Sequence, residues 1–324
     1  MKGADELPQW WSSTAAWRLL SCPLSAVPAN EPARPSAQVL GNAGSVAHLA
    51  LQQWIENGEW TREDPGMRLQ GRFDEIVASH GIDISRMPQA VITRARLKSR
   101  GRELSAILAE AEPGIRTELL LTDEGNHLFG ILDVAAGGAE GLIIDLKTGR
   151  DASAEPSPAI KHQMTFYAHL FQVTFGVPPK HVIVFNLQQG PAEIEVSPSA
   201  ITNLLGDILT AQSMGRALAR PQPDVCRFCT KRMTCEPHWK AVAAWDPPDA
   251  IEGTIVSIER SSSGLVAVSI DGHWLTGIVG SQLPDDARPG QFARAVRVRR
   301  RSDGTAPPEW AASSITEIRV LPAP

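Results

Sequence analysis

Three strand-like runs, residues 115–121, 127–134 and 141–146, follow one another with only short gaps between them. The gaps carry strong turn signals, Asp123-Glu124-Gly125-Asn126 after the first run and Gly137-Gly138 after the second. Such runs joined by tight turns predict a β-meander, in which consecutive strands lie side by side. This predicted meander limits the chain to folds in which the ends of these strands come close together.

Helical periodicity surrounds the predicted meander. Apolar residues recur at helical spacing over residues 44–57, 88–111, 157–175 and 198–218, and a further apolar run at 181–187 predicts a strand. The order is therefore helix, three strands, helix, strand and helix. We expect an α/β fold for this part of the chain.

A second region begins after Trp245-Asp246-Pro247-Pro248-Asp249, a proline-rich stretch typical of a linker. Short β-rich runs alternate with turns beyond it, which predicts a small β-barrel of OB type. We therefore expect a first domain at residues 1–243, a linker at 244–250 and an OB-like β-barrel domain at 251–324.

Composition sets the remaining limits. With 324 residues, of which 43% are hydrophobic, the chain can bury a full core and form two folded units. No apolar run approaches the roughly 18 residues that span a bilayer, so we expect a cytoplasmic protein without a membrane partner. The formal net charge is -5, so any binding to a phosphate backbone must come from local basic patches.

Two carboxylates and a lysine fall at the ends of neighbouring predicted strands. Asp145 and Lys147 project to the same face because strand side chains alternate, and a hairpin would bring Asp133 beside them. Two such carboxylates repel each other unless a hard cation such as Mg²⁺ or Mn²⁺ lies between them. An ammonium beside that cation loses its proton more readily and can help to deprotonate or position a water. A lone Asp-x-Lys is nevertheless more often a pair of strand-end turn residues with a solvated lysine.

Four spaced motifs strengthen the catalytic interpretation. They are G-x-x-x-H at 44–48, G-x-x-D at 130–133, D-x-K-T-G at 145–149 and Q-x-x-x-Y at 163–167. In this order the motifs resemble the PD-(D/E)XK superfamily of nucleases, and specifically its RecB-like branch. The resemblance covers approximately residues 12–239. For the last eighty or so residues, the predicted β-barrel is based on the pattern of strands and turns alone.

The resemblance implies a restriction-endonuclease-like core, with a mixed central sheet flanked by helices, and a role for each motif residue. The implied metal ligands for Mg²⁺ or Mn²⁺ are His48, Asp133, Asp145 and the main-chain carbonyl of Leu146. The implied catalytic set is Lys147 with Asp145, Asp133, Glu118, Gln163 and Tyr167, in which Glu118 is auxiliary and the last two orient the lysine and the DNA. Taken singly, His48, Gln163 and Tyr167 have ordinary structural explanations as a helical histidine, a surface amide and a packed aromatic.

The cysteines predict a second metal site. Cys226, Cys229 and Cys235 lie on one short segment, and a four-thiolate site requires the remaining cysteine, Cys22. A zinc site and unligated buried cysteines are the alternatives. The chain resembles a subset of the family, which includes AddB-type and CRISPR-associated nucleases, with one cysteine before the core and three after it. That resemblance favours a [4Fe–4S] cluster over Zn²⁺, with a structural role.

Two basic stretches are candidate contacts for DNA phosphates. The residues singled out are Arg94, Arg96 and Lys98 in the first stretch, and Arg297, Arg299, Arg300 and Arg301 in the second. Solvated faces or loop ends explain such runs equally well for the first stretch.

The sequence therefore predicts a metal-dependent deoxyribonuclease, an exonuclease acting on single strands or ends in DNA repair, recombination or phage defence. The alternative is a non-cleaving DNA-binding or scaffold subunit of a larger nucleoprotein complex. A zinc-stabilised RNA-binding protein ranks third. The chain contains no G-x-x-x-x-G-K-[ST] loop, so a helicase or ATPase partner, or a defence-complex subunit, would be a separate protein.

Overall fold

The computed structural model describes residues 7–27, 42–87, 89–111, 114–138, 141–149, 155–214, 217–227, 229–301 and 309–321. The chain forms two compact units. One, here called the core unit, comprises Leu7–Leu20 and Glu31–Gly215, and the other, the cysteine unit, joins Ser21–Asn30 to Arg216–Pro324. The sequence-based domain limits at 243 and 251 stay a prediction.

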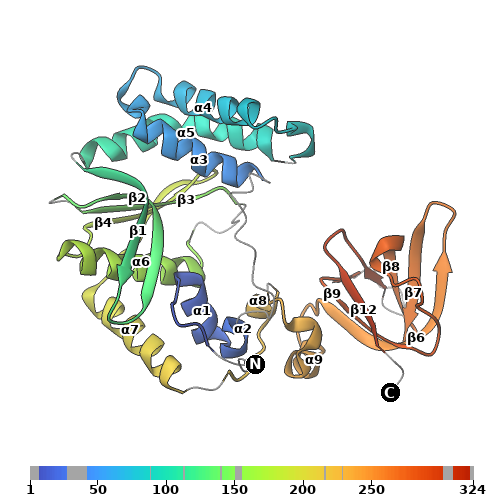
Figure 1. Ribbon diagram of the computed structural model, residues 1–324. Helices are drawn as coiled ribbons and strands as arrows, with labels where there is room; N and C mark the ends of the chain where they lie inside the picture. Colours follow the sequence, from blue (N-terminus) through green and yellow to red (C-terminus); the bar gives the residue numbers. More distant parts are fainter. Residues whose placement is uncertain are drawn as a thin grey trace. The chain divides into compact units, whose positions relative to one another are not determined.

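The core unit is built on a five-stranded mixed sheet with the order β1-β2-β3-β4-β5 (Figure 1). Three of the neighbouring pairs are antiparallel, and β3 with β4 is parallel. The strands are β1 (Ile115–Asp123), β2 (Leu128–Ala136), β3 (Leu142–Lys147), β4 (His181–Asn186) and β5 (Gly190–Glu193). The expected α/β fold with a mixed sheet flanked by helices is confirmed.

Helices cover both faces of this sheet (Figure 1). One layer consists of α3 (Ala43–Glu56), α4 (Pro65–Ser79) and α5 (Ala90–Glu110), with the short turns η1 (Glu59–Thr61) and η2 (Ile84–Arg86). The opposite layer consists of α1 (Ser13–Ser21), α6 (Pro158–Phe175) and α7 (Pro198–Ser213). The sequence-based helices match α3, α5, α6 and α7, whereas α4 was not expected.

Strand alternation divides β3 between the two helical layers. Ile144 and Leu146 are buried in the hydrophobic core that includes the apolar residues of α3, α4 and α5. Asp145 and Lys147 therefore point to the other face, where α6 lies. The start of α3 is fixed by Asn42, whose side chain accepts a 2.9 Å hydrogen bond from the Ser45 N–H.

The cysteine unit combines short helices with a curled seven-stranded sheet, in the order β10-β11-β8-β7-β6-β9-β12. Its helical elements are α2 (Pro23–Ala26), α8 (Pro223–Cys226), η3 (Arg232–Thr234), α9 (Glu236–Val242) and η4 (Gly280–Gln282). Its strands are β6 (Ala250–Arg260), β7 (Leu265–Ile270), β8 (His273–Val279), β9 (Phe292–Val296), β10 (Arg299–Arg300), β11 (Trp310–Ala311) and β12 (Glu317–Leu321). The sheet is a half-barrel, and its assignment to the OB type stays a prediction.

Membrane insertion of a helix finds no support in the described part of the chain. None of the helices there combines the length and the apolar character needed to cross a bilayer.

Helices α4 and α5 approach each other closely through two glycines. A Cβ atom built on Gly101 would lie 2.5 Å from the Gly66 Cα, and one built on Gly66 would lie 2.1 Å from the main-chain oxygen of Lys98. Both obstacles are backbone atoms, so neither can turn aside. Only glycine fits at this crossing.

We predict that Gly101→Ala lowers the free energy of unfolding by about 1–3 kcal/mol, because the added methyl group forces the two helices apart. Gly71→Ala is the matched control in α4, since nothing lies within 4 Å of the added Cβ there. It should raise stability by up to about 1 kcal/mol through its higher helix propensity. Urea unfolding of both variants measures the difference, and equal effects would contradict the close crossing.

Candidate active site

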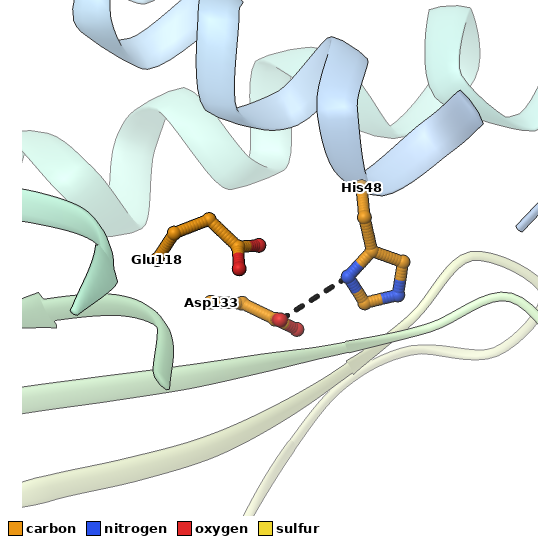
Figure 2. A group of neighbouring side chains, drawn as sticks. All are labelled: His48, Glu118 and Asp133. Carbon is orange, nitrogen blue, oxygen red and sulfur yellow. Dashed lines mark hydrogen bonds and ion pairs between the residues drawn. The ribbon is translucent and has the colours of Figure 1, made fainter. Parts of the chain in front are cut away.

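Three side chains from three elements of the core unit meet between α3 and the first two strands (Figure 2). His48 comes from α3, Glu118 from β1 and Asp133 from β2, and one ligand atom of each lies within 4.8 Å of the others. All three are half-buried. An imidazole nitrogen and two carboxylates form a donor set that suits a divalent cation.

Glu118 reaches this group because the β1–β2 ladder is interrupted beside it. Thr117 pairs with Val134 and Leu119 with Leu132, so Glu118 occupies the register position opposite Asp133 without being paired. Its φ of 46° lies in the left-handed region, which costs a non-glycine residue roughly 1 kcal/mol or more. Figure 2 shows the Glu118 carboxylate beside the Asp133 carboxylate and the His48 ring. This strained backbone therefore occurs at the candidate metal site itself.

Asp133 uses both carboxylate oxygens. Oδ1 lies 3.1 Å from His48 Nδ1, and Oδ2 accepts a 2.7 Å hydrogen bond from the Leu146 main-chain N–H. The antiparallel pairing of β2 with β3 ends at Val134 and Ile144. Beyond that pair, the Asp133 carboxylate takes the place of a main-chain acceptor from β2 for the Leu146 N–H. One side chain thus joins α3, β2 and β3.

Asp145 and Lys147 form an ion pair on the face of β3 turned towards α6. Asp145 Oδ2 lies 2.8 Å from Lys147 Nζ, and the ammonium donates a 2.9 Å hydrogen bond to Gln163 Oε1. Burial raises the pKa of Asp145, which the Lys147 charge opposes and the Asp133 charge reinforces. The Lys147 ammonium is therefore the cationic partner of the buried Oδ2 of Asp145.

A chain of polar contacts continues from Lys147 along α6. Gln163 Nε2 donates a 3.0 Å hydrogen bond to Tyr167 Oη. Burial raises the pKa of Tyr167, while its hydrogen bonds to Gln163 and Ser13 oppose the rise. A Cβ on Gly130 would lie 2.8 Å from the Tyr167 ring, so the glycine of G-x-x-D allows this ring to pack against β2.

The structure divides the predicted metal ligands between two neighbouring places. His48 and Asp133 belong to the three-residue group, in which Glu118 is the third member. Asp145 instead contacts Lys147, and Leu146 contributes its N–H to Asp133. Roles for all of these residues stay predictions.

A groove next to Glu118 was not expected from the sequence. It is open, has a volume of about 780 Å³ and lies between the C-terminal end of α3, η1 and the start of β1. Arg116, Thr117 and Glu118 line one side, and Ile55 and Trp60 line the other. Arg116 stands two residues from Glu118 on the same strand, and no single-sequence pattern distinguishes it from other exposed arginines.

The first predicted DNA-contacting stretch lies on α5. Arg94 is held by Asp74 through two hydrogen bonds, Nε to Oδ1 at 2.6 Å and Nη2 to Oδ2 at 2.7 Å. Arg96 and Lys98 have no ion pair within the part of the chain that the structure describes. Of the three, Arg94 would have to break its contact with Asp74 before it could bind a phosphate.

The second predicted stretch lies in the cysteine unit. Arg297 forms a 2.5 Å ion pair with Glu317, and Arg301 lies 3.3 Å from Glu309. The side chains of β10 (Arg299–Arg300) are exposed and line a groove. Only the two β10 arginines therefore face solvent without a carboxylate partner in the described residues.

The four cysteines belong to the same unit and line one cavity, together with Arg232 and His238. Among the described residues no three of the sulfur atoms lie within 4.8 Å of one another, so no iron–sulfur site is shown. A tetrahedral zinc ion with Zn–S bonds of about 2.3 Å would hold its sulfurs about 3.8 Å apart. Burial, reinforced by the neighbouring cysteines, raises the pKa of Cys226 to about 11, so a metal-free thiol is protonated at neutral pH.

Comparison with known proteins agrees with the site geometry. The family model described as the PD-(D/E)XK nuclease superfamily matches residues 11–236. The chain belongs to the PD-(D/E)XK nuclease superfamily, which implies a metal-dependent nuclease that hydrolyses phosphodiester bonds, with DNA as its substrate.

Other comparisons add little. A search among curated proteins found no match. A solved structure titled "Crystal structure of SSO0001" is 14% identical, covers 69% of this chain and 95% of that chain, and has a TM-score of 0.29. So low a superposition score supports no statement about function.

His48 makes the candidate metal site sensitive to pH. Burial lowers the pKa of His48, but its contact with Asp133 and the charges of Asp145 and Glu118 outweigh burial and raise the pKa above 6.5. In the metal-free protein, the protonated histidine therefore stabilises the fold fully below about pH 6.5, and this contribution is lost as pH rises through the folded-state pKa.

We predict that Mn²⁺ affinity rises with pH until the raised pKa of His48 is passed, because only the neutral imidazole can bind the ion. Below that pKa, each pH unit should change the affinity by about tenfold. Calorimetric titration between acidic and mildly alkaline pH measures the slope. His48→Asn should weaken Mn²⁺ binding and reduce the dependence of the affinity on pH. His181→Asn, which removes a surface ion pair with Glu193, should leave both the affinity and its pH dependence unchanged. An unchanged slope in His48→Asn would contradict this assignment.

Proposed function

We propose that this chain is a deoxyribonuclease of the RecB-like branch of its superfamily, acting as an exonuclease on single strands or ends. The observation that carries the proposal is the hydrogen-bonded row Asp145, Lys147, Gln163 and Tyr167 beside the His48, Glu118 and Asp133 group. DNA repair, recombination and phage defence are the processes that need such an activity. A separate helicase or ATPase, or a defence-complex subunit, is its proposed partner.

The donor set supports a metal ion as the cofactor. His48, Asp133 and Asp145, with the Leu146 carbonyl, are the proposed ligands, and the position of Glu118 supports adding it to them. Asp145 already pairs with one cationic group, the Lys147 ammonium, so its carboxylate lies where positive charge is stabilised. A bound Mg²⁺ or Mn²⁺ would polarise the phosphodiester and lower the pKa of a bound water.

Lys147 is the proposed catalytic residue. Asp145 and Gln163 hold its ammonium from two sides, so the side chain is fixed in one position. From there it can bind and orient the attacking water or a phosphate oxygen. Gln163 is itself held by Tyr167, which extends the support to a buried residue of α6.

The proposed substrate contacts are basic side chains that have no acidic partner among the described residues. Arg96 and Lys98 in the core unit, and Arg299 and Arg300 in the cysteine unit, are the favoured phosphate contacts because no carboxylate in the described residues pairs with them. Arg94, Arg297 and Arg301 would first have to release their acidic partners. We rank these three lower.

The sheet of the cysteine unit supports an OB-like domain. β6 pairs with both β7 and β9, so this long strand lies inside the sheet. β11 pairs in parallel with β8 near one edge of the sheet, and β12 pairs antiparallel with β9 at the other edge. A curled sheet of this kind supports the proposed OB-like barrel, a fold that often binds single strands.

The four cysteines, Cys22, Cys226, Cys229 and Cys235, are the proposed ligands of a [4Fe–4S] cluster. They line one cavity, which supports a shared metal centre. Zn²⁺ is the alternative occupant.

A non-cleaving scaffold subunit is the second candidate function. The exposed arginines of β10 fit binding without cleavage. The complete Asp145–Lys147 pair with its Gln163 contact argues against this alternative, because binding alone does not require it.

We predict that Lys147→Met lowers the rate of Mn²⁺-dependent DNA cleavage by about 10²- to 10⁴-fold, because the residue acts on the proton or the water in the transition state. Lys161→Gln, an exposed lysine on α6, is the matched control and should cleave like the wild type. Labelled single- and double-stranded DNA provides the assay and reveals strand preference. Wild-type protein that binds DNA but never cuts it would favour the scaffold function.

A further prediction concerns the cysteines. Protein purified without oxygen should contain iron and acid-labile sulfide in equal amounts, and Cys229→Ser should lose both, because a cluster needs all four thiolates. Elemental analysis makes the measurement. Zinc in place of iron would support the alternative occupant, and absence of both metals would contradict a cysteine metal centre.

A further inference from the structure

Two buried side chains in the cysteine cavity have nitrogen atoms without a hydrogen-bond partner among the described residues. Arg232 is 2% exposed, and only its Nη2 is bound, to Asp249 Oδ1 at 2.5 Å. Its Nε and Nη1 are buried without a hydrogen-bond acceptor in the described residues. His238 is 0% exposed, and both of its ring nitrogens are likewise without a partner.

Such an arrangement is costly unless an acceptor is present. Each buried donor left without an acceptor keeps the full cost of its desolvation, and that cost is larger when the group is charged. Arg232 carries two such nitrogens and His238 carries another donor. Proteins of ordinary stability rarely keep several unpaired groups in one place. An acceptor inside the cavity would remove the cost at both residues.

Packing alone does not explain these nitrogens. The His238 ring lies 5.1 Å from the Trp239 ring and 5.2 Å from the Trp245 ring, measured between centroids, which accounts for its burial. The ion pair with Asp249 accounts for one nitrogen of Arg232. Neither contact supplies an acceptor for the remaining nitrogens, which belong to residues lining the same cavity as the four cysteines.

We propose that Arg232 and His238 are positioning residues for an anionic metal–thiolate centre held by the four cysteines. This inference rests on the proposed cysteine cluster. Four thiolates outweigh the positive charge of a [4Fe–4S] core, so the occupied cavity is negatively charged. The Arg232 guanidinium and one N–H of His238 donate hydrogen bonds to sulfur atoms and offset that charge. Such contacts from outside the ligand set tune both affinity and reduction potential.

The test compares donor-lacking with donor-retaining variants of the full-length protein, reconstituted without oxygen from ferrous iron and sulfide. Arg232→Met and His238→Leu remove the N–H groups but keep much of the side-chain volume. Arg232→Lys and His238→Gln keep a donor. Lys240→Gln, an exposed residue on the same helix as His238, controls for the loss of a positive charge. Circular dichroism checks that each variant is folded.

We expect the donor-lacking variants to hold iron about 10- to 100-fold less tightly in competition with a chelator. Their midpoint potential should also shift to more negative values, because the reduced cluster carries more negative charge. The donor-retaining variants should recover most of both properties, and Lys240→Gln should match the wild type. A merely structural role would not move the potential of a folded variant.

Two other outcomes overturn the inference and are distinguishable. If the wild type takes up iron and sulfide but the donor-lacking variants keep its potential and affinity, Arg232 and His238 are only packing residues. If the wild type takes up no iron or sulfide, the proposed cluster fails as well. The wild-type metal content therefore separates the two failures.

Discussion

The carboxylate of Asp133 is the contact on which the site depends. Its two oxygens contact His48 of α3 and the Leu146 N–H of β3, at 3.1 Å and 2.7 Å. The same side chain therefore fixes a candidate metal ligand on a helix and the strand that carries Lys147. Because β2 and β3 do not pair at this point, the carboxylate also satisfies a backbone group that would otherwise lack a partner. Ligand geometry and strand geometry are thus set by one residue.

Much of the fold follows from local patterns in the sequence. The β1–β3 meander, α6 and β4 are marked by periodicity and turn residues, which act over a few positions. Helix α4 was missed although Leu69, Phe73 and Ile76 recur at helical spacing in it. β10 and β11 contain two residues each, so their pairing depends on contacts with distant strands.

Within the site, the sequence motifs predicted roles for His48, Asp133, Asp145 and Lys147 and gave Glu118 only an auxiliary role. Its place in the ligand group depends on a positive φ and on the β1–β2 register, neither of which a sequence displays. Partners at long range were equally hidden. A run of basic residues on a helix does not show which arginine forms an ion pair with a carboxylate. Cys-x-x-Cys spacing likewise does not show that buried hydrogen-bond donors lie beside the cysteines.

His48, Glu118 and Asp133 are proposed to form a divalent-metal site beside Lys147. Anomalous X-ray diffraction from crystals soaked in Mn²⁺ is the sharpest test, because the signal locates the ion without reference to activity. We expect an anomalous peak within coordination distance of these three side chains, with Asp145 turned towards it. A well-diffracting crystal with Mn²⁺ bound only elsewhere, or with none bound while the three side chains are open to solvent, would contradict a metal site at this position.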